Sequence, residues 1–258
     1  MPDDMRGSSR GRWRRRGRVV WAVLSVFIVV SLVFGLAVLP AVAFWTWHYR
    51  WTGVPAFARV VFLAMAFVPA YLLFAAGLMV YSAAATKILG WRTRPGLATR
   101  LTDLDWPLLD WGRYLVTTHV VRLFAGATFR STPVWVLYMR LNGARIGRGV
   151  WVNSLSLMDH NLLEIGDGSV VGSDVHMAGH IVEGGVLKTA PVRVGRHVTI
   201  GIGTVVEIGA EIGDGTQIGA LSVVPKHAKL EPGAVYAGVP VRPLSKAGPP
   251  AGTDIAER

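Results

Sequence analysis

Two long runs without charged residues occupy much of the first third of the chain. Counting histidine as neutral, no charge occurs at residues 19–49 or at residues 60–86. A helix over residues 19–44 would be about 39 Å long, enough to cross a hydrocarbon core of roughly 30 Å with some tilt. The pattern therefore predicts two transmembrane helices, over residues 19–47 and 59–89, that form a hairpin.

Basic residues flank both runs and account for much of the formal net charge of +11. Seven arginines lie in a basic tail at residues 1–18, whereas the loop between the runs carries two. Seven more follow the second run: Arg92, Arg94, Arg100, Arg113, Arg122, Arg130 and Arg140. Because positive residues tend to stay on the cytoplasmic side, we expect a multi-pass protein of the cytoplasmic (inner) membrane with both termini inside. The distribution favours a lipid bilayer as partner over nucleic acid. A cleaved signal peptide is the alternative for the first run, which is longer than the apolar core of about 7–15 residues usual in such peptides.

Residues 101–143 mix aromatic and aliphatic side chains with charged ones, as at Trp106, Trp111 and Arg113. This mixture is typical of amphipathic helices that lie on a bilayer surface. A soluble helical cap on the following domain is the alternative. The polar residues 245–258, rich in proline and glycine, are expected to form a disordered tail.

The most regular pattern is a period of six residues in the second half of the chain. Apolar side chains recur at Val194, Ile200, Val206, Ile212, Ile218, Val224, Leu230 and Tyr236, and mostly small ones four positions after each. Earlier blocks at residues 165–177 and 146–158 keep the period, one residue out of phase with each other. In a left-handed parallel β-helix, three such hexads form one triangular coil whose interior the apolar residues fill. Since coils bury surface only against their neighbours, this persistent period predicts an all-β helix over residues 144–244.

The period fails at residues 181–191, which fit no hexad. The spacing from Met177 to Val194 is 17 residues instead of 18. We expect a loop to leave the coil there, with His176 and His180 at its base. Such excursions often carry binding and catalytic groups.

These features resemble those of the hexapeptide-repeat acyltransferases. The segments GHIVEGGVLKTAPVRVG, IGALSVV and AGVPVR, within residues 179–244, are similar to the galactoside and maltose O-acetyltransferase pattern. The membrane runs and LNGARIGRGVW at residues 141–151 also resemble the membrane-embedded C-terminal regions of nonribosomal-peptide-synthetase-like proteins. The resemblance implies a homotrimer that uses acyl-CoA, such as acetyl-CoA, as co-substrate.

The resemblance also implies roles for individual residues. It places a general base at His180, which would remove a proton from an acceptor hydroxyl as that group attacks the thioester. Glu183, in the same loop, is a candidate to orient the imidazole. Ser154 aligns with the oxyanion-stabilising asparagine of sugar acetyltransferases, and Asn153 is adjacent. The candidates for CoA binding are Gly201, Ala220, Lys226 and Arg242.

Two absences narrow the chemistry. The chain has no cysteine, which excludes disulfides, cysteine-ligated zinc and an acyl-cysteine intermediate. A zinc site at His176 and His180, perhaps with His160, is disfavoured because carbonic anhydrases of this fold pair histidines five residues apart, and here the interval is four. We therefore expect no metal.

Three functions remain open at this stage. The first is acyl transfer to a small-molecule, lipid-linked or peptide acceptor through a hydroxyl or amine. The second is amide-bond formation from the thioester of a carrier protein. The third is a non-catalytic trimeric scaffold, favoured by two departures from the sugar acetyltransferases: the missing asparagine, and the missing tryptophan of their VWIG segment, where this chain has residues 198–201.

Overall fold

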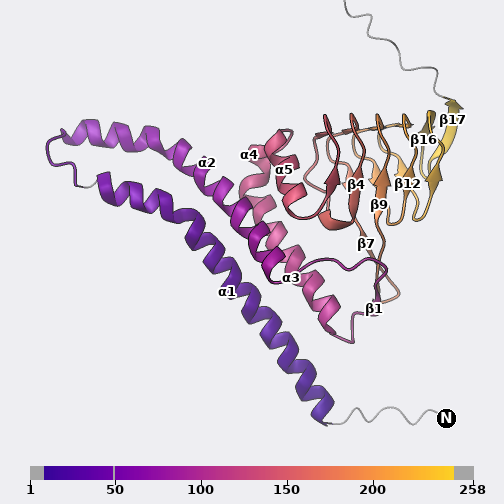
Figure 1. Cartoon of the computed structure of the whole chain (residues 1–258), viewed down its shortest axis with the longest axis horizontal. Coiled ribbons are helices and arrows are strands. Elements are labelled where there is room, and N and C mark those ends of the chain that lie inside the picture. Colours follow the sequence, from indigo (N-terminus) through magenta and orange to yellow (C-terminus); the bar gives the residue numbers. More distant parts are fainter. Residues whose placement is uncertain (1–8, 49, 247–258) are drawn as a thin grey trace, which may run out of the picture.

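The computed structural model describes residues 9–48 and 50–246, without the side chains of residues 9–12 and 245–246. Its first two elements are long helices, α1 (Ser9–His48) and α2 (Ala56–Ile88). They lie side by side and run in opposite directions (Figure 1). Both are long and apolar enough to cross a membrane. Helix α1 begins earlier than the predicted span, so residues 9–18 of the predicted basic tail are helical.

Helices α1 and α2 approach each other closely where both carry small residues. A Cβ atom added to Gly77 would lie 3.3 Å from the Cα atom of Ala37. Small residues at such positions let two apolar helices pack backbone against backbone. Most of the remaining surface of both helices is exposed apolar side chain, as expected of helices whose outer surface contacts lipid.

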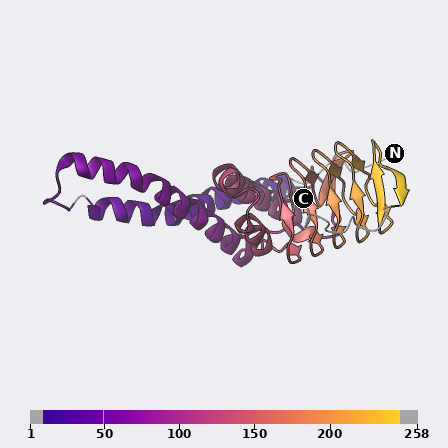
Figure 2. The same cartoon turned by 90° about the horizontal axis from the view of Figure 1, so that it is seen from above.

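A helical layer follows, where the sequence predicts amphipathic helices. It consists of α3 (Trp106–Val121), the π-helical turn η1 (Arg122–Gly126), α4 (Ala127–Phe129) and α5 (Pro133–Leu141). Asp105 caps α3 by accepting a hydrogen bond from the backbone N–H of Leu108 at 3.1 Å. Trp135 and Tyr138 of α5 are buried in one core with α2 and the first β-coil. The layer therefore packs between the long helices and the β-domain (Figure 2).

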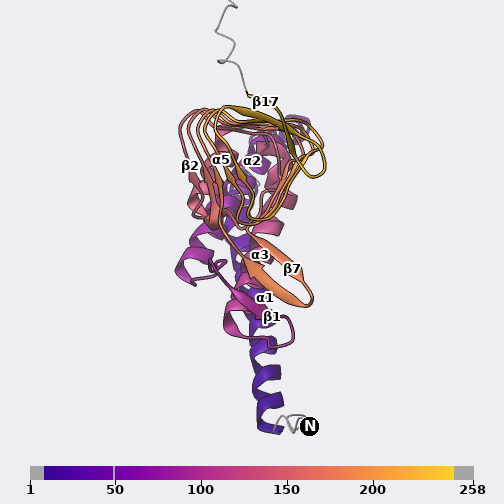
Figure 3. The same cartoon turned by 90° about the vertical axis from the view of Figure 1, so that its right-hand side faces the viewer.

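The second half of the chain winds into a prism with three parallel sheet faces (Figure 3). The first face is β3 (Trp151–Val152), β5 (Val170–Val171), β10 (Thr199–Ile200), β13 (Gln217–Ile218) and β16 (Ala234–Ala237), closed by the antiparallel strand β17 (Arg242–Lys246). The second is β6 (His176–Met177), β11 (Val205–Val206) and β14 (Val223–Val224). The third is β2 (Arg145–Ile146), β4 (Leu163–Ile165), β9 (Val192–Val194), β12 (Glu211–Ile212) and β15 (Lys229–Leu230). Ile200 pairs with Ile218 and Val206 with Val224, so three hexads make one coil, and the sheets fit the predicted left-handed β-helix.

The repeated apolar residues fill the prism as predicted. All eight from Val194 to Tyr236 are buried, with at most 8% of each side chain exposed. One prediction in the first coil is wrong: Leu157, not Met158, points inward and pairs with Met177. The step from Val152 to Leu157 is five residues instead of six, and the chain then turns into η2 (His160–Leu162) through Asp159, whose φ is 55°. This turn lengthens the coil, so that Ile146 pairs with Ile165, 19 residues later.

The segment that breaks the period is a β-hairpin. Strands β7 (His180–Glu183) and β8 (Val186–Thr189) leave the prism and pair antiparallel with each other. Strand β1 (Ala98–Arg100), which lies shortly after α2 in the sequence, completes a three-stranded sheet by pairing with β8. The predicted excursion is therefore present, and it is tied to the segment that follows the second long helix. Of the predicted tail, residues 247–258 lie outside the described residues, and residues 245–246 end β17.

Candidate active site

The central feature of the site is a contact between a histidine and a buried carboxylate. The Nδ1 atom of His180 lies 2.5 Å from the Oδ2 atom of Asp159. The side chain of Asp159 is fully buried, whereas that of His180 is 16% exposed. A carboxylate acceptor favours the imidazole tautomer with its hydrogen on Nδ1, which leaves Nε2 with a free lone pair. The geometry suits a histidine that accepts a proton through Nε2.

Asp159 keeps its buried charge by accepting further hydrogen bonds. The hydroxyl of Thr93 donates to its Oδ1 atom at 2.6 Å, and the backbone N–H of Gly179 donates to Oδ2 at 3.1 Å. Thr93 is itself fully buried, and the side chain of Asn161 donates to its carbonyl at 2.7 Å. Buried charges are tolerated when such partners replace water. Asp159 is thereby fixed in one position beneath His180.

Two more side chains surround the imidazole. The ring of Trp111, on α3, meets His180 edge-on with centroids 5.0 Å apart. His176, on β6, is half-buried, and burial lowers its pKa, with nearby His180 and Arg122 adding to the effect and Asp159 opposing it. A low pKa keeps His176 neutral at physiological pH. His180 is thus covered on one side by the helical layer.

His160 belongs to the core rather than to the site. Its ring lies edge-on to Tyr138, Tyr114 and Trp135 at centroid distances of 5.7, 6.4 and 6.5 Å. Burial lowers its pKa to about 4. Within residues 9–48 and 50–246, no three histidine, aspartate or glutamate side chains are grouped as metal ligands.

An apolar cavity of about 300 Å³ lies beside the site, between α3 and residues 155–160. Leu115, Trp135 and Leu157 are among its lining residues, and its lining also includes Thr118, His119, Arg122 and His160. Met158, immediately before Asp159, also lines it. An apolar group can therefore be buried close to the histidine–aspartate pair.

The structure gives Glu183 a different partner from the one expected. Its carboxylate forms an ion pair with Lys226, and a second with Lys188 at 3.2 Å, at the end of the hairpin away from His180. The hydrogen bond from Lys226 lowers the pKa of Glu183 and raises that of Lys226. Asp159 orients the imidazole instead. The structure does bring Lys226 and the hairpin that carries His180 to the same edge of the prism.

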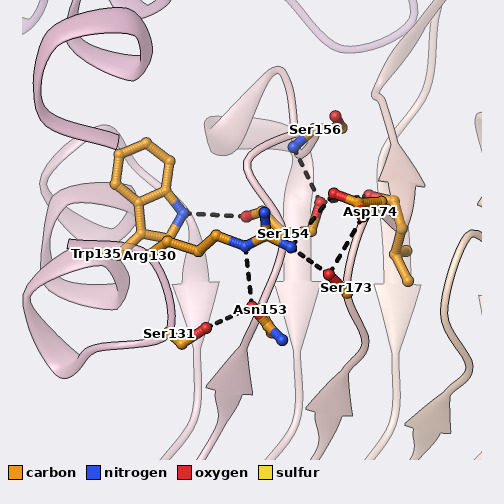
Figure 4. Close-up of polar contacts among 9 residues, drawn as sticks. Arg130, Ser131, Trp135, Asn153, Ser154, Ser156, Ser173 and Asp174 are labelled. Atoms are coloured by element: carbon orange, nitrogen blue, oxygen red, sulfur yellow. Dashed lines mark hydrogen bonds and ion pairs between the residues drawn. The ribbon is translucent and has the colours of Figure 1, made fainter. Parts of the chain in front are cut away.

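The two residues proposed to stabilise an oxyanion are already engaged (Figure 4). Ser154 is fully buried, and its hydroxyl donates to the carbonyl of Val175 at 2.7 Å while accepting from the N–H of Ser156 at 3.0 Å. The side-chain oxygen of Asn153 accepts from Arg130 at 3.0 Å and from Ser131 at 2.5 Å. Ser154 therefore holds adjacent coils together, contrary to the expectation, and the carbonyl of Asn153 anchors the α4–α5 turn.

The candidate CoA-binding residues are divided between two places on the prism. Gly201 and Ala220 follow neighbouring strands of the first sheet, where a Cβ atom on Gly201 would meet the backbone of Gly219 at 2.7 Å. Lys226 follows β14 of the second sheet, on the edge that carries the hairpin. Arg242 begins the closing strand β17 and is exposed. Within one chain, Lys226 thus contacts the far end of the hairpin that carries His180, whereas Gly201 and Ala220 follow strands of another sheet.

Comparisons with known proteins identify relatives of the β-helix, although no family model matches the chain. Galactoside O-acetyltransferase of Escherichia coli (strain K12) is 34% identical over 118 residues, covering 43% of this chain and 56% of that protein. The β-helix is homologous to the hexapeptide-repeat acetyltransferases. Delta-poly-L-ornithine synthetase of Acinetobacter baumannii (strain AB307-0294) is 25% identical over 114 residues, 44% of this chain and 9% of the synthetase.

A solved structure of a hexapeptide-repeat acetyltransferase is among those to which the chain is similar. The protein, from Vibrio cholerae O1 biovar eltor and complexed with acetyl coenzyme A, is 22% identical, with a TM-score of 0.38. The match covers 42% of this chain and 62% of that one. The chain spans just over half the length of the galactoside acetyltransferase and less than a tenth of the synthetase. The resemblance found in the sequence to hexapeptide-repeat acetyltransferases is confirmed for the β-helix.

Sequence reasoning missed three residues that contact the site of this acetyltransferase-like domain. Asp159 lies at the phase slip of the first coil, outside every hexad. Thr93 and Trp111 belong to the helical half of the chain, where no repeat indicates a position relative to His180. The phase slip at residues 157–165 is the one signal that pointed to Asp159, because a second interruption of the period marks a second excursion of the backbone.

Proposed function

We propose that this protein is a membrane-anchored acyltransferase that moves an acyl group from CoA, or another thioester, to a hydroxyl or amine. The observation that carries the proposal is the hydrogen bond between the Nδ1 atom of His180 and the buried carboxylate of Asp159. A surface histidine without a role would not need a charged partner kept out of water by two further hydrogen bonds. The homology to an O-acetyltransferase supports acyl transfer as the reaction in which the pair takes part.

The proposed reaction is direct transfer between two bound substrates. Nε2 of His180 takes the proton of the acceptor O–H or N–H as the acceptor attacks the thioester carbon. The carbon–sulfur bond then breaks, and the departing thiolate receives the proton from the imidazolium. General-base assistance of this kind typically raises a rate about 10²–10⁴-fold. Asp159 stabilises the transient imidazolium, and the cavity beside Leu115 offers space for an apolar part of a substrate.

The proposed donor is acyl-CoA, bound between copies of the chain in a homotrimer. Lys226 supplies a positive charge near the hairpin, where a CoA phosphate would form a charge-assisted hydrogen bond. The separation of Gly201 and Ala220 from His180 supports an arrangement in which two chains complete one site. Arg242 lies on the closing strand and is the weakest member of the proposed set.

The proposed location is the inner membrane, with α1 and α2 as spans and the β-helix in the cytoplasm. Two observations support this. Both helices are long and apolar, and in the most apolar 18-residue stretch of each only 17% and 11% of the residues are buried within the chain. Arginines precede α1's apolar part and follow α2, where the positive-inside rule expects the cytoplasm.

A second candidate is amide-bond formation from a carrier-protein thioester. The relationship to Delta-poly-L-ornithine synthetase favours it. The same base would then deprotonate an amine, and the donor would be the carrier's thioester instead of CoA. A non-catalytic scaffold, the third possibility, leaves the buried Asp159–His180 pair without a purpose.

The test is thioester consumption by the purified full-length protein. Released thiol can be followed with a thiol reagent, because the chain contains no cysteine to react in its place. We expect turnover in the natural protein and at least a hundredfold loss in His180→Ala and Asp159→Asn. His227→Asn is the matched control: His227 is exposed, and its φ of 57° is one that asparagine tolerates. Unchanged turnover in folded His180→Ala would refute the proposed base.

Acyl-CoA and a carrier-bound aminoacyl thioester should be supplied in parallel reactions. Turnover of acyl-CoA supports the first candidate, and turnover of the carrier thioester alone supports the second. If the folded protein consumes neither donor with any acceptor class offered, the scaffold is the better description.

A further inference from the structure

A large basic pocket lies at the end of α2, and its lining includes Thr93, whose hydroxyl donates to the carboxylate of Asp159. Its volume is about 1120 Å³, and its walls come from the end of α2, the segment after it, α3, the end of α5 and the first β-coil. These elements meet where the long helices join the β-domain (Figure 1). The pocket is separate from the exposed edge of His180 but shares Thr93 with the site.

The lining carries five positive residues and no negative one. Lys87, Arg92, Arg94, Arg140 and Arg145 all contribute to the walls, and none of the sixteen lining residues is an aspartate or glutamate. Their convergence from separate elements gathers positive charge around a concave space. Such an arrangement favours a bound anion.

Only part of this charge is neutralised within the described residues. Arg145 pairs with Glu164 at 3.0 Å, and Arg94 approaches Asp110 at 4.0 Å, both acidic residues lying outside the pocket wall. Arg140 donates to the carbonyls of Ile146 and Gly147. Lys87 and Arg92 form no ion pair with any other residue that the structure describes. An anion that accepts hydrogen bonds from both side chains would neutralise their charges.

The usual reason for basic residues beside a membrane helix covers some of the five. Lys87 lies in the last turn of α2 and Arg140 in the last turn of α5, where a positive charge complements the helix dipole. Arg92, Arg94 and Arg145 are outside these helices. The polar side chains of Thr86, Thr93 and Asn142 are buried in the same walls, so the pocket has a built floor and is more than a solvated basic surface.

We propose that this pocket binds the phosphate group of an anionic membrane lipid. The pocket follows α2 directly, so the proposed topology places it at the level of the cytoplasmic headgroups, where phosphate is the abundant anion. Arginine forms bidentate hydrogen bonds with phosphate, and lysine adds a point charge. The proposal depends on the membrane position of α2 and not on any acyl-transfer activity.

The test measures thermal unfolding of the full-length protein in neutral detergent. The probes are a short-chain phosphatidylglycerol, the matching phosphatidylcholine and inorganic phosphate. A ligand that binds the folded state raises the unfolding temperature with concentration. We expect saturable stabilisation by phosphatidylglycerol, and an apparent Kd about tenfold higher in Lys87→Gln/Arg92→Gln, the change expected when charge-assisted contacts are lost.

Arg14→Gln/Arg15→Gln is the matched control, since it removes two exposed charges near the start of α1, outside the pocket. It should bind phosphatidylglycerol like the natural protein. If inorganic phosphate stabilises equally well and the pocket variant loses this, the site is a phosphate site but the lipid source is wrong. Equal stabilisation of natural protein and pocket variant, or none of either, overturns the proposal. The single variant Arg92→Gln provides a second reading if the double variant does not fold.

Discussion

The hydroxyl of Thr93 lies 2.6 Å from the Oδ1 atom of Asp159, although the two residues are 66 positions apart in the sequence. Thr93 follows the second long helix, and Asp159 ends the first β-coil. The bond therefore fixes the carboxylate that contacts His180 from the side of the two long helices. This relationship makes the segment after α2 part of the proposed active site.

Replacing Thr93 tests that relationship. Thr93→Val keeps the shape but removes the donor to a buried charge, a loss of roughly 1.5–3 kcal/mol for such a hydrogen bond. We expect kcat to fall about tenfold or more while the KM for the thioester stays unchanged, and Thr93→Ser to restore kcat. A fall in the amount of folded protein with kcat preserved would indicate that Thr93 only supports the fold.

Ser154 should contribute to stability and not to chemistry. Ser154→Ala leaves the carbonyl of Val175 and the N–H of Ser156 without their partner, at about 1–3 kcal/mol for a buried unsatisfied group. Thermal unfolding should shift to lower temperature, with turnover per folded molecule retained. The opposite result, lost turnover at an unchanged unfolding temperature, would return Ser154 to the role expected from the sequence.

The buried ring of His160 predicts a stability change in mildly acidic solution. Burial lowers its pKa to about 4, below the value near 6.5 of an unfolded histidine. Protonation therefore favours the unfolded chain. The free energy of unfolding is therefore not reduced by this group above about pH 6.5. It falls as the pH drops from 6.5 to 4, by on the order of 3 kcal/mol in total.

Unfolding measured across this pH range should show the loss in the natural protein. His160→Phe keeps an aromatic ring among Tyr114, Trp135 and Tyr138 but cannot be protonated, so its stability should depend less on pH. The exposed histidine variant His227→Asn should behave like the natural protein. Parallel pH curves for all three would contradict the assignment.

Lys226 should affect the binding of CoA rather than the chemical step. Lys226→Met removes the charge proposed to meet a CoA phosphate, so the KM for acetyl-CoA should rise about tenfold with kcat little changed. Acetyl-pantetheine has no such phosphate, and its KM should not change. Equal effects on both donors would point instead to the ion pair that Lys226 forms with Glu183.

The membrane topology can be read by labelling single cysteines. Because the chain has none, Gly53→Cys in the loop between the long helices and Arg193→Cys on the β-helix each introduce one reactive site. A membrane-impermeant maleimide should label Gly53→Cys in intact cells and Arg193→Cys only after the membrane is opened. Labelling of both in intact cells would contradict the proposed orientation.

The β-helix could be predicted almost completely because its physics is local and repeated. Each hexad contains one apolar residue that points inward. Ile200 and Ile218 pair because three hexads complete one coil. Where the repeat weakens, the prediction fails by one residue: Leu157 and Met158 are both apolar, and only the turn at Asp159 decides which one points inward.

The site was predicted less fully because its contacts join distant parts of the chain. His180 stood out at the failure of the period. Its partner Asp159 is 21 residues earlier. Glu183 is nearer to His180 in the sequence, but its carboxylate pairs with Lys226 and Lys188. Thr93 and Trp111 come from helices and connecting segments whose placement against the prism depends on tertiary packing, which no periodicity reports.

The pairing of β1 with β8 has a practical consequence for anyone who would divide this molecule. A shortened chain beginning at Ala144 would retain every coil and its buried apolar residues, yet it would lack the strand that flanks the hairpin, the donor to Asp159 and the indole against His180. Such a fragment would keep the β-helix but lose contacts that hold Asp159 in place and cover His180. A crossover that exchanges the β-helix between relatives should therefore lie before Trp91, so that the segment after α2 stays with the β-domain.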